Sequence, residues 1–121
     1  ANGVLSKSYN AESKFDGATD YRASMPQYKK ESFEKNRQLF EMLEQLAEKK
    51  HATPAQVSMA WMINKKPWIV PIPGTRNLSR MKENFGAADI LFSQEELAAI
   101  DKTLNEMEMS DVFGGARIIN G

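Results

Sequence analysis

The sequence predicts an α/β fold that is mostly helical and contains one clear buried parallel strand. Residues 68–72, Trp-Ile-Val-Pro-Ile, are apolar at both alternating sets of positions, which is typical of a strand covered on both faces of a parallel sheet. Helical patterns precede and follow this strand, and helix–strand–helix is the repeating unit of α/β folds. Such a strand needs neighbours on both sides. Because no other segment offers a convincing parallel strand, we expect the rest of the sheet to lie outside these residues.

The composition limits the classes of function. The 121 residues correspond to one domain or part of one. The 16 basic and 16 acidic residues balance to a net charge of +0, so no overall field would attract nucleic acid or an anionic membrane. The absence of Cys and the single His exclude disulfides, thiolate zinc sites and multi-histidine metal centres. No apolar run is long enough to span a bilayer and no cleavable signal pattern is present, which predicts a cytoplasmic protein.

Residues 1–30 are predicted to form a long loop, interrupted by Gly, Asn, Asp and Pro, that holds the three tyrosines of the chain. A loop of this length in a compact domain is usually functional or disordered. Residues 32–50 are predicted to form one amphipathic helix, because an apolar stripe lies opposite its Glu and Lys residues. We expect His51, just past its end, to be a helix-end residue and not a catalyst.

The next helix begins at a strong capping signal. Thr53 is the expected N-cap, Pro54 occupies the first turn, and Gln56 completes a capping box. The pattern continues to about residue 64, and the predicted strand 68–72 follows. Pro71 and Pro73 cannot donate ladder hydrogen bonds, so pairing should fade near the end of the strand.

The helix after the strand is predicted over residues 78–88, with Asn77 as its N-cap. Its core-facing stripe is expected to consist of Leu78, Met81, Phe85 and Ala88, while Arg80, Glu83 and Asn84 lie on the other side. Ser93 and Glu96 form a second capping box, which begins a last helix through about Met107. The Gly-rich residues 110–121 are expected to be a mobile extension.

A strand that passes through Gly74 into a helix N-terminus favours an anion site, because free N–H groups and the helix dipole both attract negative charge. Gly74 would let a ligand approach the backbone closely, and the guanidinium groups of Arg76 and Arg80 can converge on one phosphate. Glu83 and Asn84, three and four residues after Arg80, offer an acceptor and an amide suited to an exocyclic amine and ring nitrogens. We therefore interpret the ligand as a nucleotide, with its phosphate at the two arginines and its adenine at Glu83 and Asn84.

The same residues also have simpler interpretations. Gly74 after a strand is ordinary turn chemistry, Arg80 and Glu83 could form a surface ion pair, and Asn84 could be solvated. Sequence motifs of this kind do produce false matches.

Four stretches of the chain resemble the aldo-keto reductases. VPIPGTRNLSRMKENFGAADI is similar to the segment that closes the barrel of that family and holds NADPH, and TPAQVSMAWMINKKPWIVPIPGT resembles the helix that leads into the last strand. ANGVLSKSYN is similar to the loop after the seventh strand, and YRASMPQY to the Arg-Ser element of that loop. Together these stretches cover most of the chain.

The resemblance implies an eight-stranded (β/α)8 TIM barrel with its site at the carboxyl ends of the strands. These residues would be its C-terminal part: residues 1–30 as the cofactor-side loop, 31–109 as helices and the last barrel strand, and 110–121 as the tail. The catalytic residues of the family would lie upstream, so none is expected here, Tyr9, Tyr21 and Tyr28 included. The chain alone is expected to be inactive and to need the upstream part of its own barrel.

The resemblance also implies a role for each site residue. Arg76 and Arg80 would contact the 2′-phosphate of NADP(H), with Thr75 and Asn77 assisting beside Gly74, and Glu83 and Asn84 would contact the adenine. The pyrophosphate side would be lined by Ala1, Asn2, Gly3 and Leu5, and Arg22 would reach over the cofactor as part of a clasp. The intact protein would be an NADPH-dependent oxidoreductase that reduces a carbonyl substrate, an aldehyde or ketone, to an alcohol. A non-catalytic regulatory subunit of the same fold and a helical partner-binding module remain alternatives.

Overall fold

The computed structural model describes residues 3–6 and 8–111. These residues form α-helices and short 3-10 helices joined by loops, and no strand occurs among them. The chain divides into two compact units, Ala1–Gln38 with Glu108–Gly121, and Leu39–Met107. None of the helices in the described residues is long and apolar enough to cross a membrane.

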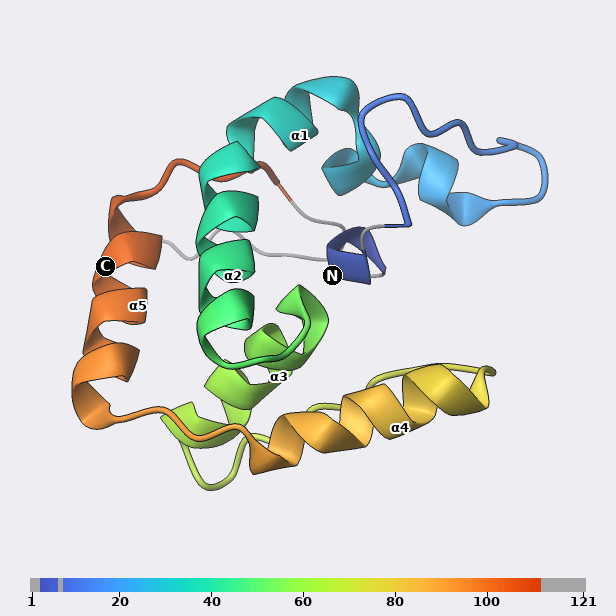
Figure 1. The fold of residues 1–121 in the computed structure, drawn as a ribbon. Helices are drawn as coiled ribbons and strands as arrows, with labels where there is room; N and C mark the ends of the chain where they lie inside the picture. Colours follow the sequence, from blue (N-terminus) through green and yellow to red (C-terminus); the bar gives the residue numbers. More distant parts are fainter. Residues whose placement is uncertain (1–2, 7, 112–121) are drawn as a thin grey trace. The chain divides into compact units, whose positions relative to one another are not determined.

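The first unit is built around an aromatic cluster. Three 3-10 helices, η1 (Val4–Ser6), η2 (Tyr21–Ser24) and η3 (Pro26–Tyr28), interrupt the segment that was expected to be a loop, and α1 (Lys30–Lys35) follows (Figure 1). The Tyr28 ring is buried and meets the rings of Tyr9 and Phe15 edge-on, with centroids 5.6 and 4.8 Å away. Edge-to-face ring contacts stabilise a cluster beyond the burial of its area. The loop over residues 1–30 is therefore ordered by its own side chains where it is described.

The single helix predicted over residues 32–50 is interrupted. α1 ends at Lys35, Asn36 has φ −85° and ψ 3°, and α2 (Arg37–Lys49) then begins. The Asn36 side chain is buried and forms two hydrogen bonds with Ser110, donating to its Oγ at 2.9 Å and accepting from its N–H at 3.0 Å. A buried amide must find partners, and those of Asn36 lie in a segment distant in sequence, so local periodicity gave no sign of the break.

The second unit packs its helices around α3 (Pro54–Lys65), which contacts α4 (Leu78–Gly86), η4 (Ala87–Asp89) and α5 (Gln94–Glu106) (Figure 1). Apolar side chains from several helices form its core. The buried apolar residues of this unit are Leu43, Ala47, Val57, Met59, Ala60, Ala87, Phe92, Leu97 and Ile100.

Polar contacts join these helices at their edges. Asp101 of α5 accepts hydrogen bonds from the Trp61 indole and the Lys65 ammonium of α3, both at 3.0 Å. The Asn64 amide donates to the Ile90 carbonyl at 2.9 Å and accepts from the Phe92 N–H at 3.3 Å, which holds the segment between η4 and α5. Burial of Asp101 opposes its ionisation, but the hydrogen bonds from α3 outweigh that effect and leave its pKa below the usual value.

The predicted helix starts are confirmed. Thr53 and Ser93 form complete capping boxes with Gln56 and Glu96, and the Asn77 side chain accepts from two N–H groups of α4. His51 lies just after α2 with a φ of 51°, as expected for a helix-end residue.

The buried strand predicted over residues 68–72 is not observed. This segment is a plain connection between α3 and α4 (Figure 1), with Trp68, Val70 and Ile72 exposed by 73%, 77% and 93%. The reason is physical: an extended segment forms a strand only when a neighbour completes its backbone hydrogen bonds, and the described residues supply none.

The predicted orientation of α4 is also wrong in this structure. Leu78, Met81 and Phe85 were expected to face the core but are exposed by 62%, 42% and 73%. The face that contacts α3 instead carries half-buried Glu83 and, just beyond the helix, buried Ala87. Without a sheet to cover the apolar stripe, polar contacts to α3 decide which face of α4 is inward.

Candidate functional site

The helix start after Gly74 is organised by two side chains. Asn77 Oδ1 accepts hydrogen bonds from the N–H groups of Ser79 and Arg80 at 2.9 and 3.2 Å. Thr75 Oγ1 accepts from the Asn77 N–H at 3.1 Å. We had expected free N–H groups at this helix start to bind an anion. Two of them already donate to the Asn77 side chain, so fewer are available than the sequence suggested. The Asn77 Nδ2 group and the arginine side chains are the donors best suited to an anion here.

Arg76 and Arg80 are both exposed. Arg76 immediately precedes the N-cap and Arg80 lies in the first turn of α4, so both are attached to one rigid helix start. Cations there raise the positive potential that the helix dipole already produces. Two guanidinium groups beside a capped helix start are suited to a doubly charged phosphate monoester.

Gly74 lies in open space, where an added Cβ would meet no atom within 4 Å. Its φ lies outside the left-handed region, so the backbone itself does not demand glycine. The structure therefore shows open space beside the backbone at Gly74.

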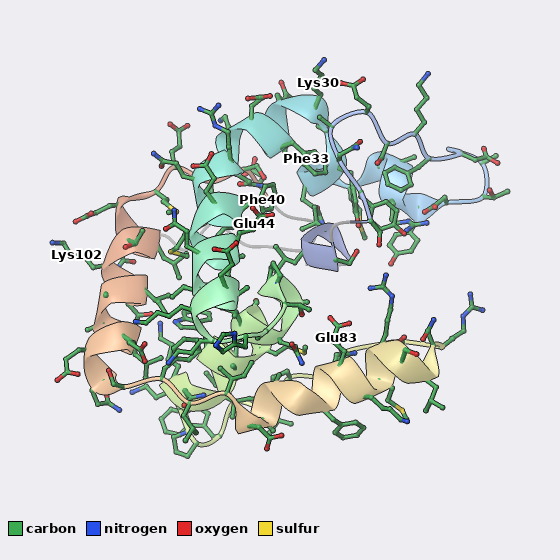
Figure 2. The ribbon with its side chains drawn as sticks, viewed as in Figure 1. Lys30, Phe33, Phe40, Glu44, Glu83 and Lys102 are labelled. Atoms are coloured by element: carbon green, nitrogen blue, oxygen red, sulfur yellow. The ribbon has the colours of Figure 1, made fainter. Side chains whose placement is uncertain are left out.

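Glu83 and Asn84 are half-buried on α4. The Glu83 carboxylate points from α4 toward the side on which α3 lies (Figure 2), where its Oε1 accepts a hydrogen bond from the Thr53 hydroxyl at 2.8 Å. Its other oxygen accepts no hydrogen bond from the described residues.

The remaining predicted residues belong to the first unit. Gly3 has a φ of +91°, and an added Cβ would lie 3.4 Å from the Tyr9 ring and 3.5 Å from the Tyr28 hydroxyl. Glycine is therefore favoured at this position by its backbone conformation, since the contacts of an added Cβ would be ordinary van der Waals contacts. Leu5 lies half-buried in η1. Ala1 and Asn2 lie outside the described residues.

Arg22 is held in a cage of loop side chains. Its guanidinium lies 4.9 and 4.8 Å from the ring centroids of Tyr9 and Phe15, and it donates to both oxygens of Asp20 and to the Tyr9 hydroxyl. The hydrogen bonds between the two side chains raise the pKa of Arg22 and lower the pKa of Asp20. The cage gives the predicted clasp residue a defined position, and its charge is largely matched by Asp20.

Burial raises the pKa of Tyr28, which keeps its hydroxyl protonated.

No group of His, Cys, Asp or Glu suited to a metal ion occurs within residues 3–6 and 8–111. Sequence reasoning missed the contact of Thr53 with Glu83, because a capping box predicts only the contacts within its own helix.

Comparison with known proteins shows a matching family and several similar relatives. Residues 1–105 match the model of the aldo/keto reductase family. The chain is 35% identical over 107 residues to aldo-keto reductase str7 of Strobilurus tenacellus, covering 88% of this chain and 32% of the relative. It is 36% identical over 96 residues to probable aldo-keto reductase 1 of Glycine max, covering 79% and 27%.

The name of a third relative includes a cofactor. Aldo-keto reductase yakc [NADP(+)] of Schizosaccharomyces pombe is 34% identical over 107 residues, covering 88% of this chain and 31% of the relative. The chain thus spans about a third of the length of the curated relatives it matches. The match over residues 1–105 includes the loop of the first unit and the helix start that carries Arg76 and Arg80, so the chain belongs to the aldo/keto reductase family.

Proposed function

We propose that these residues are the NADPH-binding C-terminal part of a barrel oxidoreductase that reduces an aldehyde or ketone to an alcohol. The observation that carries the proposal is the placement of Arg76 and Arg80 on either side of the Asn77 cap, both exposed at one helix start. The name of the relative from Schizosaccharomyces pombe, which includes NADP(+), supports the same cofactor.

In this proposal the described residues bind and orient the cofactor, and the cofactor supplies the hydride. Arg76 and Arg80 neutralise the 2′-phosphate, with Thr75 and Asn77 beside them and Gly74 allowing close approach. Glu83 and Asn84 contact the adenine. Gly3 and Leu5, with Ala1 and Asn2, line the pyrophosphate side, and Arg22 retains the cofactor from the loop.

We also propose that these residues form part of a barrel. Residues 68–72 become its last strand when neighbouring strands complete their hydrogen bonds, and the exposed stripe of Leu78, Met81 and Phe85 becomes covered. We use "complete barrel" for the polypeptide that joins these residues to the other strands. Hydrogen exchange tests this part: the Val70 amide should exchange freely in the 121-residue chain and be strongly protected in the complete barrel. Free exchange in both would contradict the barrel assignment.

Cofactor selectivity tests the phosphate assignment. In the complete barrel, Arg76→Ala and Arg80→Ala should each weaken NADPH binding by roughly tenfold or more, because each removes a charge-assisted hydrogen bond. NADH binding should hardly change, because NADH lacks the 2′-phosphate. Lys82→Ala, which removes an exposed charge from the same helix, is the control. Unchanged NADPH affinity, or equal losses for NADPH and NADH, would remove the assignment.

A further inference from the structure

The capping box of α3 reaches beyond its own helix. Thr53 Oγ1 accepts the Gln56 N–H at 3.2 Å, which is the ordinary capping bond. The same hydroxyl lies 2.8 Å from Glu83 Oε1 on α4. Because a carboxylate can only accept, the hydroxyl proton must be directed to Glu83. One side chain therefore caps α3 and fixes a carboxylate of the neighbouring helix.

The Gln56 side chain also binds α4, through the main chain of Glu83. Its Oε1 accepts from the Thr53 N–H at 3.0 Å, and its Nε2 donates to the Glu83 carbonyl at 2.7 Å. Gly86 leaves room for this amide, since an added Cβ would lie only 2.8 Å from Gln56 Nε2. Glu83 is thus tied to the start of α3 through both its side chain and its backbone.

This arrangement limits the freedom of Glu83. An unrestrained glutamate loses considerable rotamer entropy when a ligand orders it, and the Thr53 hydrogen bond orders it beforehand. With Oε1 occupied, Oε2 stays available as an acceptor with a defined direction. An acceptor of this kind matches an exocyclic amine and repels a carbonyl oxygen.

We propose that Thr53 is a positioning residue that directs Glu83 to accept a hydrogen bond from the exocyclic amine of the adenine ring, and so makes the site selective for adenine over hypoxanthine. This inference rests on the proposed function, because it concerns how the NADPH site recognises its base. It adds a residue from a neighbouring helix that contacts no part of the cofactor itself.

The test compares two nucleotides in the complete barrel: NADPH and reduced nicotinamide hypoxanthine dinucleotide phosphate, which has a carbonyl in place of the amine. Binding is measured by titration calorimetry. Thr53→Val should weaken NADPH binding roughly five- to tenfold, as expected for one lost hydrogen bond, and leave the affinity for the hypoxanthine nucleotide unchanged. Thr53→Ser retains the hydroxyl and should behave as the unaltered protein does.

Two further variants separate positioning from stability. Thr53→Asp keeps a capping oxygen but cannot donate to Glu83, so it should fold and still lose the preference for adenine. Ser93→Ala removes the equivalent cap from α5 and touches no part of Glu83, so it should lower stability without changing the preference.

Equal weakening of both nucleotides in Thr53→Val, or retained adenine preference in Thr53→Asp, would overturn the positioning role while leaving the NADPH site in place. Failure of the unaltered barrel to bind NADPH at all would overturn the proposed function, and this inference with it.

Discussion

Replacing Glu96 by Gln removes the charge of a carboxylate in the second unit that accepts three hydrogen bonds. Glu96 Oε1 accepts from Lys49 at 3.0 Å, and Oε2 accepts from Lys50 and from the Ser93 N–H, both at 2.9 Å. These contacts join the end of α2 to the start of α5. The Lys50 hydrogen bond, with help from Ser93 and Lys49, lowers the pKa of Glu96 from its usual 4.5 to about 2.

The lowered pKa sets both the size and the pH range of the effect. A carboxylate with a depressed pKa stabilises the folded state above the unfolded value, near pH 4.5, and this stabilisation is lost as the pH falls toward 2. A shift of this size corresponds to at most about 3 kcal/mol. The Lys49 side chain is 65% exposed and Glu96 is 22% exposed, so solvent screening reduces the expected value to about 1–2 kcal/mol.

The measurement is urea unfolding of the complete barrel at several pH values between 7 and 2.5. Glu96→Gln should lower the free energy of unfolding by about 1–2 kcal/mol at pH 7, with the difference shrinking below pH 4.5 as Glu96 itself becomes protonated. Glu95→Gln is the matched control, because Glu95 lies in the same helical turn and accepts a hydrogen bond from the Ser93 hydroxyl. A deficit that stays constant with pH, or one of equal size in Glu95→Gln, would refute the reasoning.

Three other substitutions test single contacts. A change from Gly to Ala within a helix usually raises the free energy of unfolding by about 1 kcal/mol. Gly86→Ala should not give this increase, because the new Cβ displaces Gln56 Nε2 from its hydrogen bond. A full increase in the free energy of unfolding would contradict this. Asp101→Ala should lower the free energy of unfolding by about 1–3 kcal/mol by leaving the Trp61 indole without its acceptor, while Asp89→Ala at an exposed site should not. Arg22→Lys, which loses the paired hydrogen bonds to its acidic partner, should speed proteolysis of the loop before α1, and an unchanged cleavage rate would show that the cage does not order it.

The sequence alone was sufficient for the helix starts and for part of the candidate site. Thr53, Asn77 and Ser93 were all identified as caps, because a cap depends on groups within about four residues of one another. The placement of Arg76 and Arg80 around the start of α4 follows from the same local rule. Family membership was also readable from these motifs, and the match over residues 1–105 confirms it.

Tertiary structure decided the features that depend on distant partners. The helix break at Asn36 depends on Ser110, 74 positions later, and the direction of Glu83 depends on Thr53, 30 positions earlier. Whether residues 68–72 form a strand depends on neighbours that complete the backbone hydrogen bonds. Periodicity shows which residues share a face of a helix or strand, but the elements that pack nearby determine whether that face becomes buried.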